Sequence, residues 1–375
     1  MSINRLLMTQ FRNYSHAQID FSPNMNIVFG PNGSGKTTVL EAIHCLTVTK
    51  SFRTAYDKQM VQHEEEYYQL EGEFVTGEDH EVIQLNYAMN QGKKLFINSR
   101  EQSKLSSVVG RYPTVTLTPE DSEITFGPPV VRRKYVNKIM SQASPEHMGR
   151  LMRLQSVLKQ RNAIIQEAAD TQRSPDETFL SVYDDQLAGV AAEIEQARQR
   201  FLDRFEPTFQ SVYADIYGKD RQVQFRFSPS VAYESDTQFF TEFMETLRNR
   251  RNQELGFRRT VVGPQSDGYE LYLDGRSLRQ YGSQGEHKLV LIALKLAEGR
   301  YLKEEKGRAP IFLLDDLFAE LDVERSQKVL HAIENPGQIL ITSTDLADVR
   351  HHNIDIAGEE VAIFDMNEIR DREDL

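Results

Sequence analysis

The sequence predicts an α/β fold whose sheet is assembled from both ends of the chain, with a mainly helical lobe inserted between them. Near the N-terminus, an apolar strand at 27–29 runs into a glycine-rich loop, and apolar residues at helical spacing follow it. Near the C-terminus, a second apolar strand at 311–314 ends in two aspartates. We therefore expect a head formed by residues 1–117 and 251–375, and a helical lobe formed by 118–250.

The composition indicates a globular protein of two or three domains. The chain has 375 residues, and domains average roughly 150 residues. Hydrophobic residues make up 39% and charged residues 27%, which is enough apolar surface for a buried core. The single cysteine, Cys45, leaves no partner for an internal disulfide. Neither a signal sequence nor an apolar run of ~20 residues is visible, so we expect a cytoplasmic protein.

Proline-containing caps predict where the helices of the middle region begin. Thr118, Ser144 and Ser174 each precede a proline, so a hydroxyl cap is followed by proline at the first helical position. Apolar residues then recur on one helical face of the last segment. We expect two long helices, near 145–168 and 175–217, that form an antiparallel arm with this face packed inside.

Further elements complete the α/β part. Alternating or apolar runs predict strands near 69–75, 81–88, 94–98, 269–273, 338–341 and 361–364. A long helix follows Gly282 and continues to about Tyr301, and a helix capped by Asp322 follows the two aspartates.

A complete phosphate-binding loop comprises Gly30, Pro31, Asn32, Gly33, Ser34, Gly35, Lys36 and Thr37. Its glycines let backbone N–H groups converge on phosphate oxygens, and the following helix adds its positive N-terminal end. The Lys36 ammonium is placed to reach the β- and γ-phosphates, and the Thr37 hydroxyl to coordinate Mg²⁺. The preceding strand and the following helix are the context that this motif needs, so we expect ATP as the ligand.

Asp315 and Asp316 follow the apolar strand at 311–314. A site that hydrolyses a nucleotide needs a carboxylate for the metal ion and a group that positions the attacking water. We assign Asp315 to Mg²⁺, directly or through water, and Asp316 to the water. Asp316 and Lys36 are therefore the predicted catalytic residues.

Ser283, Gln284, Gly285 and Glu286 predict a capping box at the start of the long helix. Gly285 has no side chain to block access to the first turn, and Ser283 presents a hydroxyl. This helix end can therefore donate hydrogen bonds to a γ-phosphate. The glycine-rich loop already serves the site of the same chain. The natural recipient is therefore the nucleotide of a second subunit.

Together these features resemble the ABC-type ATPase heads of chromosome-maintenance proteins. An ordered set of short motifs along nearly the whole chain is similar to the RecF family of bacterial recombination-repair proteins. These motifs are Phe11-Arg12-Asn13-Tyr14, Leu40-Glu41-Ala42-Ile43, Lys50-Ser51-Phe52-Arg53, Leu158-Lys159-Gln160-Arg161-Asn162, Ser283-Gln284-Gly285, Leu313-Leu314-Asp315-Asp316 and Glu320-Leu321-Asp322.

The resemblance implies an ABC-like head with a helical second lobe and no long coiled coil. It also implies a homodimer formed on ATP binding, slow ATP hydrolysis, and binding to single-stranded, gapped or duplex DNA. The same resemblance implies that the protein works with the RecO and RecR proteins, helps to load recombinase and supports SOS induction. On this chain, residues 30–37 with Thr38 bind ATP, residues 283–286 sense the partner's nucleotide, and residues 319–322 cross the dimer interface.

Several positions depart from the family pattern. Residues 263–268 read Gly-Pro-Gln-Ser-Asp-Gly, where the family usually has Gly-Pro-His-Arg-Asp-Asp. Lys288 stands where arginine is more usual, and Thr38 stands where asparagine is frequent. Thr342 follows the strand at 338–341 in place of the switch histidine of ABC transporters, which favours the RecF pattern.

Candidate DNA contacts come from local cationic clusters, because the net charge of −12 excludes a protein covered in positive charge. Arg132 and Arg133 are the favoured pair, since the family also has two arginines there. They can instead anchor the helical lobe on the head. Other clusters lie at 93–94, 248–251 and 258–259, and Arg53 can serve ATP, DNA or an internal acid.

The leading interpretation is a weak, DNA-dependent ATPase of recombinational repair and replication. The alternative is a structural DNA-binding module for which ATP is only a regulatory ligand. A transporter ATPase subunit is the third interpretation, and the absent switch histidine and the two-helix insertion disfavour it.

Overall fold

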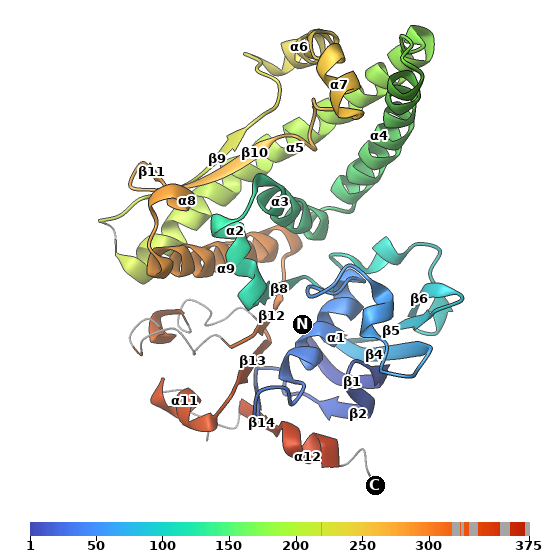
Figure 1. Cartoon of the computed structure of the whole chain (residues 1–375). Coiled ribbons are helices and arrows are strands. Elements are labelled where there is room, and N and C mark those ends of the chain that lie inside the picture. Colours follow the sequence, from blue (N-terminus) through green and yellow to red (C-terminus); the bar gives the residue numbers. More distant parts are fainter. Residues whose placement is uncertain (219, 317–322, 324–325, 330–336, 353–360, 372–375) are drawn as a thin grey trace. The chain divides into compact units, whose positions relative to one another are not determined.

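The computed structural model describes residues 1–218, 220–316, 323, 326–329, 337–352 and 361–371 (Figure 1). The chain forms two compact units: residues 1–122, 211–219 and 288–375 make up the first, and residues 123–210 and 220–287 the second. The first unit is thus built from both ends of the sequence, as expected. The segment 251–287 was expected in the head but belongs to the second unit, because its strand pairs there.

One sheet of the first unit is antiparallel, with the strand order β2-β1-β4-β5-β6-β7. Its strands are β1 (Ser2–Phe11), β2 (Tyr14–Asp20), β4 (Tyr67–Thr76), β5 (Asp79–Ala88), β6 (Gly92–Ile97) and β7 (Arg100–Glu101). Buried and exposed positions alternate along β2 and β4, as in a sheet with one face on the core. The predicted strands near 69–75, 81–88 and 94–98 are confirmed.

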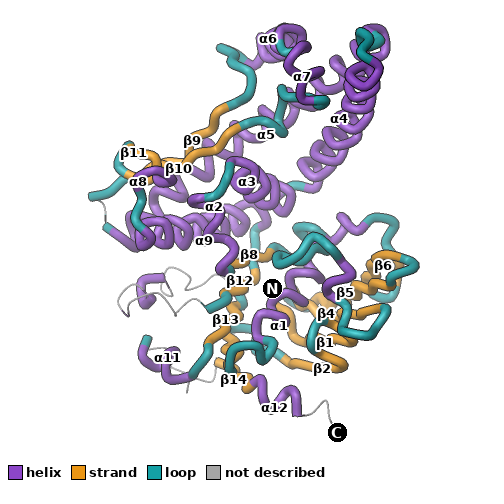
Figure 2. Tube along the Cα trace, viewed as in Figure 1, coloured by secondary structure: helices purple, strands orange, loops and turns teal. Residues whose placement is uncertain are grey.

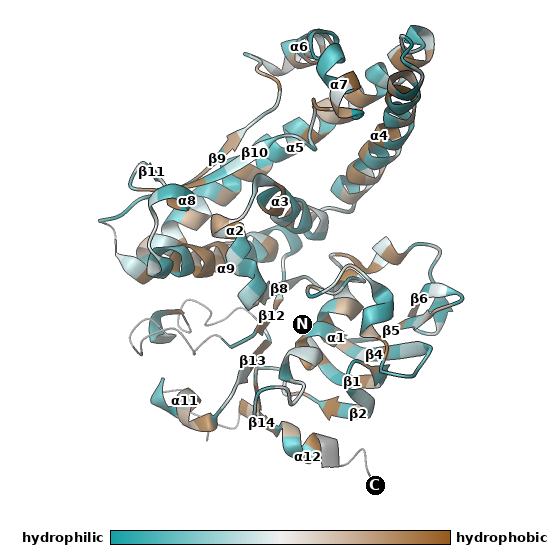
Figure 3. Ribbon diagram, in the orientation of Figure 1, coloured by the Kyte–Doolittle hydropathy of each residue, from teal (hydrophilic) through white to brown (hydrophobic). Residues whose placement is uncertain are grey.

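A second sheet of this unit is parallel, with the order β14-β3-β13-β12-β8. Its strands are β3 (Met25–Phe29), β8 (Thr114–Leu117), β12 (Ile311–Leu314), β13 (Ile339–Ser343) and β14 (Val361–Asp365). Every residue of β12 and β13 is buried, which explains their continuous apolar runs, and Figure 3 shows both strands as hydrophobic. β3 pairs with β13 and β14, so an N-terminal strand lies between two C-terminal ones.

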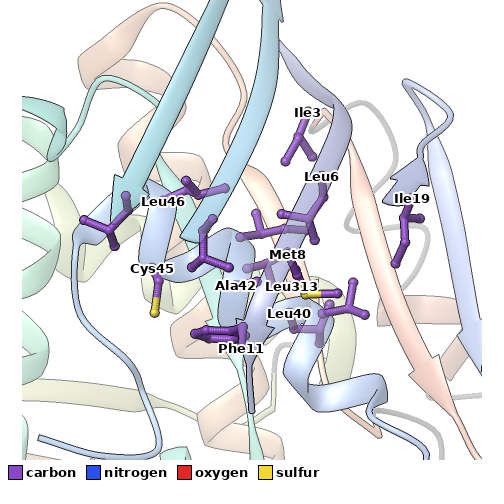
Figure 4. Packing of buried hydrophobic residues seen from close by; sticks show 14 of the residues in the cluster. Ile3, Leu6, Met8, Phe11, Ile19, Leu40, Ala42, Cys45, Leu46 and Leu313 are labelled. Carbon is purple, nitrogen blue, oxygen red and sulfur yellow. The ribbon is translucent and has the colours of Figure 1, made fainter. Parts of the chain in front are cut away.

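Helix α1 (Lys36–Val48) lies between these two sheets. It contacts β4 and β5 of the antiparallel sheet and β8 and β13 of the parallel sheet, and almost all its residues are buried. Figure 4 shows its side chains packed beside Ile3, Leu6, Met8 and Phe11 of β1 and Leu313 of β12. Burying each such side chain contributes about 1.5–3 kcal/mol. This core fixes the start of α1, and with it the glycine-rich loop.

The second unit combines an antiparallel helix pair with a small sheet (Figure 2). The pair consists of α4 (Pro145–Thr171) and the part of α5 (Glu177–Tyr217) up to residue 210, and both helices lie close to their predicted ranges. Arg153 of α4 pairs with Glu193 of α5, and Arg161 further along α4 pairs with Asp184 nearer the start of α5, so the helices run antiparallel. The sheet has the order β11-β10-β9, with β9 (Val223–Ser228), β10 (Gly268–Leu273) and β11 (Arg276–Ser277).

The remaining elements are short connectors or covering helices. They are η1 (Asp57–Met60), η2 (Leu105–Val108), η3 (Pro119–Ser122), α2 (Glu123–Phe126), α3 (Pro129–Ala143), α6 (Asp236–Asn249), α7 (Arg251–Phe257), α8 (Leu278–Tyr281), α9 (Gln284–Lys306), α11 (Leu346–His351) and α12 (Met366–Asp371). Among the described helices, none combines the length and the apolar character needed to cross a membrane.

The predicted caps are confirmed at one long helix and wrong at the other. The Ser144 hydroxyl accepts a hydrogen bond from the backbone N–H of His147 and caps α4. At α5, a carboxylate oxygen of Asp176 accepts from the N–H groups of Thr178 and Phe179, at 2.9 and 3.2 Å. Aspartate is as good an N-cap as serine and lies next to the first helical residue, so it replaces the predicted Ser174.

Candidate nucleotide-binding site

A cavity of about 540 Å³ opens in the first unit where the parallel strands end. The glycine-rich loop follows β3, two aspartates follow β12, and threonines end β13, so all three contribute to its wall. Ligands of parallel α/β sheets bind at this edge of the sheet. The lining residues are Arg12, Asn13, Asn32, Gly33, Gly35, Lys36, Thr37, Thr38, Arg53, Gln59, Val61, Pro119, Asp315, Asp316, Thr342 and Thr344.

The loop has the backbone conformation that its glycines permit. Gly33 and Gly35 have φ angles of 82° and 100°, in the left-handed region that other residues avoid. A Cβ on Gly35 would also collide with the hydroxyl of Tyr14, which donates a hydrogen bond of 3.2 Å to the carbonyl of Ser34. The Tyr14 of the Phe-Arg-Asn-Tyr motif therefore supports the loop from behind.

Lys36 turns its ammonium group back onto the loop. Its Nζ donates to the carbonyl oxygens of Gly30 and Pro31, at 2.7 and 3.0 Å. Burial lowers the pKa of Lys36, and the negative charges of Asp316 and Asp315 oppose that shift. The ammonium therefore lies in the cavity wall as a cation held by loop carbonyls and attracted by two carboxylates.

The two chain ends meet in a hydrogen-bonded cluster. The Thr37 hydroxyl lies 2.9 Å from a carboxylate oxygen of Asp315, and the Thr342 hydroxyl donates to the other oxygen at 2.7 Å. Thr342 also accepts from the backbone N–H of Asp316, at 2.9 Å, where φ is 52°. Burial raises the pKa of Asp315; the threonine hydrogen bonds lower it, and the nearby charges of Asp316 and Glu120 raise it further.

The oxygen donors of this cluster fit magnesium. A threonine hydroxyl and a carboxylate are hard ligands, and Mg²⁺ is usually held by few protein groups together with waters and phosphate oxygens. Thr37 and Asp315 fit a metal ion that is shared with a phosphate ligand, because they supply two oxygen donors and leave the other positions to phosphate and water.

Residues of the early motifs also line the cavity, and sequence reasoning left their roles open. Glu41, fully buried on α1, receives two hydrogen bonds from Arg12, at 2.6 and 2.9 Å, and a weaker contact from Arg53 at 3.4 Å. Of the roles left open for Arg53, the internal acid is therefore observed, while its side chain still lines the cavity. A glutamate inside the apolar α1 segment was the signal that could have predicted this cluster, because a buried charge needs a partner.

The predicted capping box at the start of α9 is confirmed. The Glu286 N–H donates to the Ser283 hydroxyl oxygen at 3.3 Å, and the Ser283 N–H donates to the Glu286 carboxylate at 2.9 Å. Arg221 also pairs with Glu286, at 2.8 Å. The Ser283 N–H and then Arg221 lower the pKa of Glu286 to about 2, so this carboxylate is charged and well partnered.

Two groups of predicted site residues remain predictions. Residues 283–286 belong to the second unit and were assigned to the nucleotide of a partner subunit. The interface segment predicted at 319–322, including the helix cap at Asp322, lies outside the described residues.

The predicted DNA-contact arginines do not lie on an open basic surface. Arg132 is 2% exposed, and its guanidinium donates to the carbonyl oxygens of Tyr269, Ile124 and Gly127. Arg133 is partly buried and donates to the carbonyl oxygen of Asp267 at 2.7 Å. Both arginines hold α3 to β10 and its neighbours within the second unit.

Fold and site together define a class of protein. The chain has the features of an ABC-type ATPase head. These are a P-loop that leads into α1, an acidic pair after β12, and a head that is split by an inserted lobe. A family model described as "RecF/RecN/SMC N terminal domain" matches residues 2–358. The chain belongs to the RecF family of DNA replication and repair proteins.

Curated relatives match over nearly the full length. The "DNA replication and repair protein RecF" of Bacillus subtilis (strain 168) is 33% identical over 361 residues, which cover 96% of this chain and 97% of the relative. The protein of that name from Salinibacter ruber is 33% identical over 350 residues, covering 92% of this chain and 85% of the relative.

Solved structures agree with this assignment. The chain is similar to "the recombination mediator protein RecF-ATP in RecFOR pathway", with a TM-score of 0.86, 26% identity and 92% of each chain covered. An Smc head bound to the C-winged helix domain of ScpA is 18% identical, with a TM-score of 0.53 over 95% of this chain and 92% of that one. The second likeness shows the shared head fold.

Proposed function

We propose that this chain binds ATP with Mg²⁺ in the 540 Å³ cavity and hydrolyses it slowly as a DNA-binding repair protein. The hydrogen bond between Thr37 and Asp315 is the observation that carries the proposal, because it places a phosphate-loop hydroxyl beside a carboxylate from the other end of the chain. The similarity of this chain to the RecF–ATP structure supports ATP as the ligand.

The chemistry follows from the positions of the side chains. The loop N–H groups and Lys36 bind the phosphates, and Thr37 and Asp315 would hold the metal ion. Bound Mg²⁺ would neutralise charge on the phosphate oxygens. Asp316 accepts a hydrogen bond from the attacking water and orients it. Thr342 keeps both aspartates in position through its two hydrogen bonds.

The proposal includes an ATP-dependent homodimer. The glycine-rich loop already serves the nucleotide of its own chain, and the capped helix start at 283–286 is a suitable donor for the phosphate of a second one. In the dimer, Ser283 of one subunit contacts the γ-phosphate bound by the other. ATP then joins two heads, and hydrolysis releases them.

The biological setting is proposed from the relatives. Proteins with this sequence pattern are described as DNA replication and repair proteins, and a similar structure is described as part of the RecFOR pathway. We infer that this chain acts on single-stranded, gapped or duplex DNA with RecO and RecR, helps to load recombinase and supports SOS induction. The segment 263–268 carries no assigned role in this scheme.

Sedimentation of the full chain with and without Mg²⁺–ATP tests the dimer. We expect dimers with ATP, longer-lived dimers in Asp316→Asn, and weaker hydrolysis in Lys36→Arg. Ser283→Arg should block dimerisation while ATP binding to the single chain stays nearly intact. Ser181→Arg, at an exposed position on α5, is the matched control and should dimerise normally.

The same preparation separates hydrolysis from ATP binding alone. A DNA-stimulated turnover that rises with protein concentration supports the ATPase, because each site then needs a second chain. Equal turnover per chain in dilute monomer and in dimer would contradict the shared site. Binding without any turnover would favour the structural DNA-binding module.

A further inference from the structure

A second cavity, of about 370 Å³, lies wholly within the second unit. It is bounded by the hairpin of β10 and β11, by α8 and by the start of α3, elements that lie together in Figure 1. The turn of the hairpin, Asp274-Gly275, has φ angles of 51° and 75°, as its tight two-residue connection requires. The nucleotide chemistry of the first unit makes no use of this cavity.

Arg132 is a buried residue that lines this cavity. Its Nε and Nη1 atoms are bonded to three carbonyl oxygens, so the guanidinium is fixed in one orientation. Nη2 has no acceptor among the described residues, and it is not one of the polar atoms that are sealed from solvent. A side chain that is 2% exposed therefore keeps one accessible nitrogen, with two N–H donors, on the cavity wall.

Two further arginines line the same cavity. Arg276 on β11 and Arg279 on α8 are exposed, and neither guanidinium has a partner in the described parts of the chain. Burial, followed by the positive charge of Arg279, lowers the pKa of Arg132, and the negative charge of Glu270 opposes that shift. Of the described lining residues, Glu270 alone is acidic, and the Tyr272 hydroxyl donates to it at 2.8 Å.

The chemistry of this cavity fits a phosphate group. Guanidinium groups present parallel N–H donors that match two oxygens of a phosphate, and three of them converge here against one carboxylate. Tyr281 also lines the cavity and is 70% exposed, so its ring is available for stacking. Arginines beside an exposed aromatic ring are typical of proteins that bind single-stranded nucleic acid.

We propose that this cavity binds one backbone phosphate of single-stranded nucleic acid, with Arg132 at its floor, Arg276 and Arg279 at its rim, and Tyr281 stacked on a neighbouring base. A recessed phosphate site favours a flexible single strand over a stiff duplex, whose bases are also unavailable for stacking. The inference rests on the proposed DNA binding and locates one of its contacts.

Fluorescence anisotropy of the full chain with a labelled oligo-dT tests the site. The Arg276→Ala/Arg279→Ala double variant should bind at least roughly ten-fold more weakly, because charge-assisted hydrogen bonds are lost. The slope of log K against log salt should fall in magnitude by about 0.7, the value for one phosphate contact on a single strand. Arg173→Ala, at an exposed arginine outside the cavity, is the control and should change affinity much less.

Tyr281→Leu separates stacking from charge. It should weaken oligo-dT binding several-fold and leave the salt slope unchanged, because no phosphate contact is lost. A duplex of equal length should respond less than oligo-dT to both the arginine and the tyrosine variants. All three substituted residues are exposed, and thermal unfolding should show that both variants keep the fold.

The outcomes distinguish this inference from the proposed function. Wild-type affinity and salt slope in the double variant would overturn the phosphate site while DNA binding by the chain stands. A chain that binds no oligonucleotide with or without ATP would overturn both. Displacement of oligo-dT by inorganic phosphate, beyond the effect of chloride at equal ionic strength, would point to a small-anion site and against a nucleic-acid contact.

Discussion

Replacing Thr342 by valine removes one hydroxyl that supports both aspartates of the nucleotide site. Valine has nearly the same shape, so the packing of β13 should survive. The change removes the 2.7 Å hydrogen bond to Asp315 and leaves the Asp316 N–H without its 2.9 Å acceptor. A bond to a charged group contributes about 1.5–3 kcal/mol, and an unsatisfied N–H costs about 1–3 kcal/mol.

The expected effect is a loss of about 2.5 kcal/mol in transition-state stabilisation, the sum of the two low ends, because both hydrogen bonds are only partly buried. That loss corresponds to a roughly seventy-fold slower turnover. The Thr342 hydrogen bond also lowers the pKa of Asp315, so its removal should raise that pKa further. Because Mg²⁺ needs the ionised carboxylate, the acid limb of the pH–rate profile should move to higher pH.

Steady-state Mg²⁺–ATP hydrolysis across a pH series measures both effects, and urea unfolding checks the fold. Ser343→Ala is the control. The Ser343 hydroxyl donates to the backbone carbonyl oxygen of Asp345 and makes no hydrogen bond to Asp315 or Asp316. Wild-type turnover and an unmoved acid limb in Thr342→Val would refute the role assigned to this threonine.

Three further predictions concern the loop and the second unit. Gly35→Ala should abolish nucleotide binding in a titration, since the new Cβ meets the Tyr14 hydroxyl, whereas Gly33→Ala, with open space around it, should lose less. Arg161→Met removes the fully buried cation that pairs with Asp184 and Glu254, while Arg251 still contacts both carboxylates, so it should lower the free energy of urea unfolding by about 3 kcal/mol, the low end for a broken buried ion pair; a loss below ~1 kcal/mol would contradict this. Burial lowers the pKa of His147 from 6.5 to about 3, so unfolded chains bind a proton that folded ones do not. The free energy of unfolding should therefore fall by about 1.4 kcal/mol per pH unit between pH 6.5 and about 3, and His147→Leu should remove this pH dependence.

Local sequence patterns were sufficient to predict those features whose residues all lie in one short segment. The glycine-rich loop, the carboxylates after an apolar strand and the Ser283–Glu286 capping box were all predicted in place, because short-range backbone geometry sets their conformation. The cap of α5 was wrong, since Ser174 and Asp176 are both good caps and the sequence does not rank them.

The sequence by itself determined the α/β class, the split head, the family and the residues of the phosphate loop. Only the tertiary structure decided which distant groups meet: Thr342 beneath both aspartates, Arg12 on Glu41, and Arg132 inside a cavity with two other arginines. The physical reason is that side-chain partners follow from strand order and helix packing, which bring together residues far apart in the sequence. The spacing of residues along the chain does not predict such contacts.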